Sequence, residues 1–335
     1  MEFDLTDRST RLSCVDFLRF QQTLKDDLNR MRQQIDKLRE RGLGKQFGYA
    51  VRYVNPYEDL NVPNLTISSR AFFKMYELII RFNLLKIGSH LKTLHLCEAP
   101  GSFVEATQEY IRRHRAPSTT HEWYGVTLRE GLEWTSDSSH VIYANIITDE
   151  LPEQVRQSIL VTGDGGFEID DNVKNDQEVL NTPLLKGQIR HAVESVAIGG
   201  SIVIKMFDLF ELETCKLLWS CYGQFKKLYL AKPFGSRICN SEKYIVGVGF
   251  QSSAEHNLQN HVEQQGTEKN TQHDTNIPDW FYGALWNANR RLVQLQMQSL
   301  SQAIKLAESR VDTRSLNYSK KKEQCEKCLR WMGFK

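Results

Sequence analysis

The feature that most constrains the fold is an alternation of strand-like and helix-like segments between residues 92 and 250. Five short apolar runs, "KTLHLC", "EWYGVTL", "VIYANI", "SILVTGDG" and "SIVIKMF", are interspersed with amphipathic stretches such as "SFVEATQEYIRRHR". Strands that alternate with helices form parallel sheets covered by helices on both faces. Two further runs, "KLYLAKP" and "EKYIVGVGF", favour an antiparallel last strand in a hairpin at the sheet edge. The pattern predicts an α/β protein with a mostly parallel seven-stranded sheet.

Helical segments flank this core. Residues 15–42 carry apolar side chains at helical spacing and end at a glycine, which predicts a helical extension over residues 1–44. The α/β domain follows over 45–250. Residues 251–277 are polar and rich in Gln, Asn and His, which indicates a flexible linker or insert. A long helical pattern then predicts a C-terminal helical segment over 278–335.

The bulk composition excludes several classes of protein. The chain has 335 residues, of which 40% are hydrophobic and 25% charged, as in ordinary soluble proteins. A net charge of +2 is too small to show a nucleic-acid partner by itself. The seven cysteines follow no disulfide pattern, and Cys325 and Cys328 lack a second ligand pair, so we expect free thiols and no metal site. No signal peptide or membrane-spanning stretch is present, which predicts a soluble intracellular protein without a membrane partner.

The stretch "LHLCEAPGSF", residues 94–103, is a strand that runs into a glycine turn and a helix. Ligands of open α/β sheets bind beyond the carboxyl ends of the strands, and Gly101 allows a close approach of the backbone. The spacing is neither GxGxxG nor GxxxxGK[ST], and the carboxylate of Glu98 would repel phosphate. These features favour a ligand with a positive charge and hydroxyl groups, such as S-adenosylmethionine, whose cationic end Glu98 would face. The stretch alone also fits an ordinary strand-turn-helix junction.

The same stretch resembles motif I of FtsJ-like 2′-O-ribose methyltransferases and is most similar to their mRNA-cap branch. Four more segments resemble, in the family's order, those that carry its Lys-Asp-Lys-Glu tetrad: "SRAFFKMYEL", "TGDGGFEI", "GGSIVIKMFD" and "RICNSEKYIVGVGF". The resemblance covers about residues 45–250. It implies a Rossmann-like methyltransferase fold, the cofactor S-adenosyl-L-methionine, and a catalytic tetrad of Lys74, Asp164, Lys205 and Glu242.

The resemblance also implies a set of cofactor-binding residues. The motif I turn contributes Glu98, Ala99, Pro100, Gly101, Ser102 and Phe103. Thr127 ends the second strand, Asn145 and Ile146 follow the third beside the adenine, and Asp164 borders the methyl-transfer site. The family often has an acid after the second strand and another at the position of Asn145. Here Glu130 and Asp149 are the alternatives.

The implied reaction moves a methyl group from a sulfonium to a ribose 2′-hydroxyl. The obstacle is the alcohol, which needs a general base within hydrogen-bond reach. A lysine can be that base if burial or a nearby cation lowers its pKa. Lys205 ends an apolar strand and is our candidate base, Asp164 and Glu242 would orient it, and Lys74 would bind the hydroxyl. Taken singly, each residue could instead be an ordinary surface charge.

The expected substrate is the 5′ end of capped mRNA. Basic residues could line its path: Arg112 to Arg115, Lys226, Lys227, Lys232 and Arg237. The alternatives are a methyltransferase that acts on rRNA or tRNA, and a catalytically silent RNA-binding subunit. The glycine spacing disfavours a dehydrogenase. The expected compartment is the nucleus or cytoplasm, or the host cytoplasm for a viral protein. Protein partners, oligomeric state and the choice between first and second nucleotide stay open.

Overall fold

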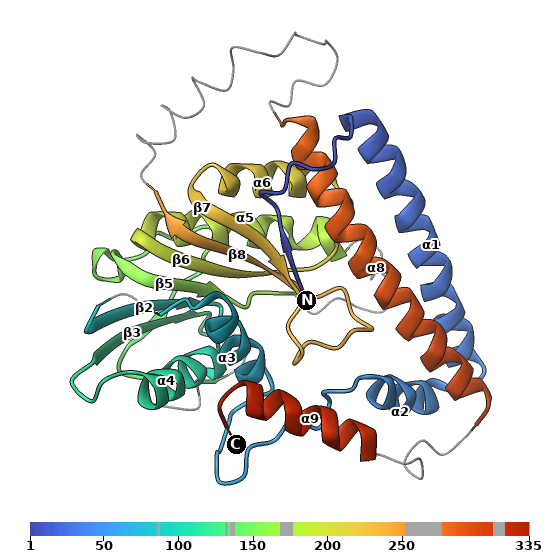
Figure 1. Ribbon diagram of the computed structural model, residues 1–335, viewed down its shortest axis with the longest axis horizontal. Coiled ribbons are helices and arrows are strands. Elements are labelled where there is room, and N and C mark those ends of the chain that lie inside the picture. Colours follow the sequence, from blue (N-terminus) through green and yellow to red (C-terminus); the bar gives the residue numbers. More distant parts are fainter. Residues whose placement is uncertain are drawn as a thin grey trace.

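The computed structural model describes residues 1–85, 88–130, 133–134, 138–167, 177–251, 277–310 and 319–334. The strands within these ranges form one sheet in the order β1-β7-β8-β6-β5-β2-β3-β4 (Figure 1). Five of them run parallel: β6 (Val196–Met206), β5 (Ser158–Gly163), β2 (His90–Leu96), β3 (Thr120–Thr127) and β4 (Val141–Tyr143). The predicted α/β class with a mostly parallel sheet is confirmed.

The last strand is antiparallel, as predicted, but it does not lie at the edge. β8 (Lys243–Phe250) pairs with β6 on one side and β7 (Phe225–Ala231) on the other. The chain leaves β6 through α6 (Leu212–Tyr222), places β7 one strand further out, and then fills the gap with β8. β8 is therefore buried between two strands, which brings its first residues next to the end of β6.

An eighth strand completes the sheet. β1 (Glu2–Asp4) pairs antiparallel with β7, with Glu2 opposite Ala231. Within the described residues, the sheet therefore has one strand more than the seven predicted. Because that strand is β1, the N-terminal segment is not purely helical. A strand of three residues is too short to leave a period in the sequence. It covers the edge of β7, which would otherwise present unpaired backbone groups.

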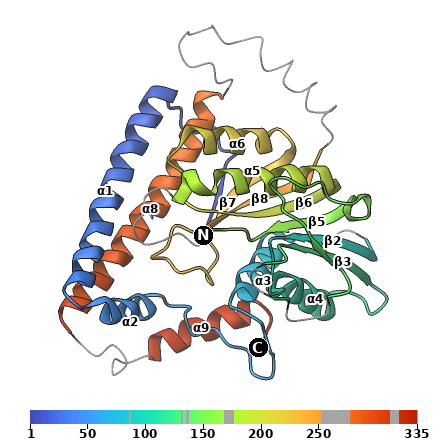
Figure 2. The ribbon, with the colours of Figure 1, turned by 180° about the vertical axis from the view of Figure 1, so that it is seen from behind.

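Helices cover both faces of the sheet (Figures 1 and 2). α5 (Gln177–Ser195) and α6 pack on one face, against side chains such as Val161 and Ile202. α3 (Ala71–Phe82) and α4 (Ser102–His114) pack on the other, against Leu160 and Val203. Neighbouring residues of β5 and β6 thus alternate between two cores, as parallel strands with both faces buried require.

The flanking helices attach to this body. α1 (Cys14–Glu40) and α8 (Asp279–Glu308) lie side by side in both views, with α2 (Gly44–Val54) at one end, and share a hydrophobic cluster (Figures 1 and 2). α9 (Ser319–Trp331) packs on α3 and buries Cys325 and Cys328. The described residues contain no cluster of three potential metal ligands and no helix long and apolar enough to cross a membrane. The predicted linker falls almost wholly on residues 252–276, outside the described ranges.

The strand order places a topological switch point between β2 and β5. From β2 the chain moves outward to β3 and β4, and it then returns to β5 and β6 on the other side. The backbone N–H of Asp164 donates a hydrogen bond to the carbonyl oxygen of Leu96 (3.1 Å). The ends of both strands therefore meet at the position where open α/β sheets bind ligands.

Candidate active site

The four residues of the predicted tetrad form two ion pairs. Lys74 Nζ, on α3, donates a hydrogen bond to Glu242 Oε2 at 2.8 Å. Lys205 Nζ, near the end of β6, lies 3.3 Å from Asp164 Oδ1, just after β5. All four side chains keep between 11% and 19% of their surface exposed. The structure thus brings together residues that are far apart in the sequence, with side chains that are mostly buried but still in contact with solvent.

A fifth residue, Tyr244, lies beside the two ion pairs and binds one of their carboxylates. It is fully buried, lies directly opposite Lys205 in the β6–β8 register, and donates a hydrogen bond from its hydroxyl to Asp164 Oδ1 (3.1 Å). Burial raises the pKa of the Tyr244 hydroxyl well above its usual value, and the charges of Asp164 and Glu242 raise it further. The hydroxyl therefore stays protonated and holds the Asp164 carboxylate in place.

The electrostatic balance favours a charged Glu242. Burial by itself would raise the pKa of this carboxyl, but the positive charges of Lys74, Lys205 and Lys232 outweigh burial and lower it to about 2. Glu242 is thus a carboxylate at neutral pH. Its negative charge offsets part of the positive charge of the three lysines, and its role as an orienting acid stays a prediction.

Lys232 is a structural residue rather than part of an RNA surface. It is only 5% exposed, and its Nζ donates hydrogen bonds to the carbonyl oxygens of Asn240 (2.9 Å) and Glu242 (2.6 Å). The prediction that Lys232 lines a basic groove is wrong, because the loop 232–242 closes around the ammonium. The ammonium cross-links this loop and fixes the backbone that carries Glu242.

Other predicted basic residues are also engaged within the protein. Arg112 and Arg113 bind Glu109 on their own helix, and Arg237 forms a paired hydrogen bond with Glu58. These interactions do not separate an RNA surface from an ordinary solvated face, so the basic lining stays a prediction.

The motif I turn has a different internal arrangement from the one predicted. Glu98 is 2% exposed, and its Oε1 accepts a hydrogen bond from the backbone N–H of Phe103 (2.7 Å). Burial raises its pKa well above the usual value. Glu98 therefore closes the turn at the start of α4 and does not present an exposed carboxylate to a cation. Its second oxygen, Oε2, is buried without a hydrogen-bond partner among the described residues.

The remaining turn residues divide into two groups. Ala99 and Pro100 are partly exposed, whereas Gly101, Ser102 and Phe103 are buried. Gly101 has a φ of 111°, which an L side chain rarely adopts, so this tight turn depends on glycine. A ligand at the switch point would meet the backbone of this turn and the two partly exposed side chains.

The expected adenine contacts are also partly rearranged. Thr127 is partly exposed at the end of β3, and Asn145 is exposed, with its Oδ1 accepting a hydrogen bond from Ile147 N (3.1 Å). Ile146 is 2% exposed and belongs to the core, so its side chain does not border a ligand, contrary to the prediction. The next residue, Ile147, is 39% exposed. Asp149 accepts a hydrogen bond from Asn145 N (2.8 Å) and closes this turn.

Sequence reasoning missed Tyr244 although a signal was present. Glu242 and Tyr244 are two residues apart at the start of a strand, and side chains at that spacing share a face. The buried position of Lys232 left no comparable signal, because a lysine at the end of a strand is exposed in most proteins.

Comparison with known proteins gives consistent matches. The sequence model of the family FtsJ-like methyltransferase matches residues 67–250. The cap-specific mRNA (nucleoside-2′-O-)-methyltransferase 2 of Danio rerio is 32% identical over 218 residues, covering 56% of this chain and 29% of the relative. The cap-specific mRNA (nucleoside-2′-O-)-methyltransferase 1 of Trypanosoma cruzi is 32% identical over 173 residues, covering 46% of this chain and 47% of the relative. An uncharacterized protein of Acanthamoeba polyphaga mimivirus is 29% identical over 220 residues, covering 58% and 28%. The chain spans less than half the length of each.

Proposed function

Because this chain belongs to the family of FtsJ-like methyltransferases, we propose that it methylates the ribose 2′-hydroxyl of a 5′-terminal nucleotide of capped mRNA. The observation that carries the proposal is the meeting of two lysine–carboxylate pairs, Lys74 with Glu242 and Lys205 with Asp164, beside the motif I turn. The choice of capped mRNA rests on the names of the relatives. The proposal is compatible with either the nucleus or the cytoplasm.

The turn at the switch point fits S-adenosylmethionine. The glycine backbone and the partly exposed Ala99 and Pro100 would border its amino-acid end, while the buried Glu98 holds the turn in shape. Exposed side chains at or just beyond the ends of β3 and β4 would offer apolar surface for its adenine: Leu128, Tyr143 and Ile147. When bound, S-adenosylmethionine supplies the methyl group on a sulfonium.

The chain's own residues would prepare the hydroxyl. In this proposal the amine form of Lys205 takes the 2′-hydroxyl proton on Nζ, while Asp164 orients that amine. Tyr244 fixes the Asp164 carboxylate through its hydrogen bond. Lys74, held by Glu242, donates a hydrogen bond to the same oxygen and stabilises the negative charge that develops there. Orientation of the hydroxyl in line with the methyl group supplies the rest of the acceleration.

The test is methyl transfer from labelled S-adenosylmethionine to two matched short RNAs, one with an N7-methylguanosine cap and one with a bare 5′ triphosphate. The wild type and Lys205→Met are compared. Cap-dependent incorporation at the 2′ position that Lys205→Met abolishes would support the proposal. Equal incorporation into both RNAs would favour a structural-RNA substrate. Binding of RNA without transfer to either substrate would favour a silent RNA-binding subunit.

A further inference from the structure

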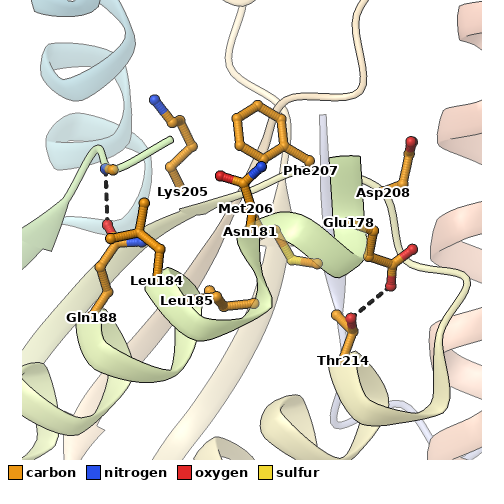
Figure 3. Close-up of a pocket in the computed structure, with 11 residues that line it drawn as sticks. Glu178, Asn181, Leu184, Leu185, Gln188, Lys205, Met206, Phe207, Asp208 and Thr214 are labelled. Carbon is orange, nitrogen blue, oxygen red and sulfur yellow. Dashed lines mark hydrogen bonds between the residues drawn. The ribbon is translucent and has the colours of Figure 1, made fainter. Parts of the chain in front are cut away.

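An aromatic side chain that has no place in the tetrad lies next to Lys205. Phe207 follows the end of β6, and Lys205 Nζ lies over its ring, 5.7 Å from the centroid. The ring is half-buried. Figure 3 shows Lys205 and Phe207 projecting to the same side from the end of β6. A flat apolar surface therefore borders the amine that the proposed function uses as its base.

The glycine turn after Asp164 makes room for this ring. A Cβ at Gly166 would lie 2.8 Å from Phe207 Cζ and 3.2 Å from Lys205 Cε. Contacts below about 3.0 Å do not occur for real Cβ atoms, so any side chain here would displace the ring. Glycine at this position thus lets the ring and the amine stand together beside Asp164.

The backbone that carries the ring is held from several sides. Lys243 Nζ donates a hydrogen bond to the carbonyl oxygen of Phe207 (2.6 Å). The next residue, Asp208, is 3% exposed and pairs with Arg32 of α1 at 2.8 Å. Asn289 of α8 donates a hydrogen bond to the carbonyl oxygen of Leu209 (2.7 Å). Helices outside the family match therefore help to fix the position of Phe207.

Phe207 lies within reach of the base of a nucleotide whose 2′-hydroxyl contacts Lys205. A hydroxyl in hydrogen-bond contact with Lys205 Nζ would be about 3 Å from it. In a nucleotide the base is attached to the ribose carbon next to the one that bears the 2′-hydroxyl. Stacked rings have centroids about 4.5–7 Å apart, so the base of that nucleotide would reach a ring 5.7 Å from the same Nζ.

We propose that Phe207 stacks on the base of the nucleotide whose 2′-hydroxyl is methylated. This inference rests on the proposed function and deepens it, because it names the part of the RNA that the site holds. Stacking on an aromatic ring tolerates every base, because each has a π-face. The site therefore accepts all four nucleotides at the methylated position with similar affinity.

The experiment compares wild type, Phe207→Leu and Phe207→Tyr on two capped RNAs that differ only at the target nucleotide, which is intact in one and abasic in the other. Equilibrium binding is measured by fluorescence anisotropy, and transfer by steady-state kinetics. Phe207→Leu keeps apolar bulk but removes the ring, whereas Phe207→Tyr keeps the ring. Phe250→Leu is the matched control, because Phe250 ends β8 seven residues beyond the start of that strand, about 23 Å from the site.

Phe207→Leu is expected to weaken binding of the intact RNA, and raise its KM, by about 5-fold to 100-fold, the range measured for loss of one stacking contact. The KM for S-adenosylmethionine stays unchanged. Phe207→Tyr and Phe250→Leu bind like the wild type. On the abasic RNA, wild type and Phe207→Leu bind equally, since no base remains to stack.

Two results would overturn the inference. One is equal binding of the intact RNA by wild type and Phe207→Leu. The other is an equal loss on the intact and the abasic RNA, because a ring that only supports Lys205 would act on both alike. If the wild type transfers no methyl group, the proposed function is wrong, and the binding comparison still decides the role of Phe207.

Discussion

One buried and one partly buried histidine, His95 and His121, predict that mild acid destabilises the sheet that carries the site. His95, on the interior strand β2, is fully buried between Thr93 Oγ1 (2.9 Å from Nε2) and Thr162 Oγ1 (2.8 Å from Nδ1). His121 Nε2 lies 2.9 Å from the same Thr93 hydroxyl. Burial, with a smaller contribution from His121, lowers the pKa of His95 to about 3, and burial lowers that of His121 to about 4.

Proton uptake decides whether stability rises or falls as the pH is lowered. An unfolded histidine has a pKa near 6.5, so below that pH the unfolded chain binds protons that the folded chain does not. Stability is therefore lost as pH falls from about 6.5 toward the folded pKa values. Each pKa unit corresponds to about 1.4 kcal/mol, so between pH 7 and pH 5 each histidine lowers the free energy of unfolding by about 2 kcal/mol.

A buried acid works against this loss. Burial raises the pKa of Glu77 to about 7, so the folded chain binds its proton first and gains about 2 kcal/mol between pH 7 and pH 5. The raw pH dependence of the protein mixes these contributions. A variant that lacks one histidine isolates the contribution of that histidine to the pH dependence of the free energy of unfolding.

The assay is urea unfolding at pH 7 and pH 5 for wild type, His95→Gln and the control His90→Gln. His90 begins the same strand but keeps 68% of its side chain exposed. His95→Gln lowers stability at pH 7, but its loss between pH 7 and pH 5 should be smaller than that of the wild type by about 2 kcal/mol. His90→Gln should follow the wild type. An equal pH-dependent loss in His95→Gln and wild type would refute the reasoning.

Three further changes test the site itself. Lys205→Met should lower kcat by about 10²-fold to 10⁴-fold, the usual contribution of a general base. Binding of S-adenosylmethionine, measured by calorimetry, should be unchanged. A kcat near that of the wild type would show that Lys205 is not the base. Tyr244→Phe deletes the 3.1 Å hydrogen bond to Asp164 and should reduce kcat without altering the KM for RNA, and a change confined to KM would contradict that orienting role. Lys232→Met removes the 2.6 Å hydrogen bond to the carbonyl oxygen of Glu242 and leaves that oxygen buried. The free energy of unfolding in urea should therefore fall by about 1–3 kcal/mol. Unchanged stability would show that the loop does not depend on the Lys232 side chain.

The sequence predicted the sheet, and it indicated the four candidate residues that the structure places together, because both leave local signals. Buried parallel strands are continuous apolar runs, and the alternation with helices limits their connection. Lys74, Asp164, Lys205 and Glu242 each lie in a short segment that resembles one of the family. The structure adds their pairing, which depends on strand order and which spacing does not reveal.

What the sequence did not predict depends on strand order and on hydrogen bonds from side chains to the backbone of loops and turns. β8 lies inside the sheet because β7 is placed outside it, and no local pattern records that order. Lys232 is buried because a later part of its own loop supplies carbonyl oxygens to its ammonium. Glu98 is turned inward because the backbone N–H of Phe103 lies within its reach. In the last two cases a polar side chain that is usually exposed is buried and makes hydrogen bonds to backbone groups instead of water.

The insertion of β8 also explains how the site is assembled. Lys205 lies near the end of β6. If the neighbouring strand on this side were also parallel, its last residues, and not its first, would lie beside Lys205. Because β8 runs antiparallel, its first residues lie opposite the last residues of β6, with Tyr244 opposite Lys205 and Lys243 opposite Met206. The loop that precedes β8 therefore delivers Glu242 to the same place, within hydrogen-bond distance of Lys74 on α3. The strand reversal is thus the step that turns two separate lysine–carboxylate pairs into one site.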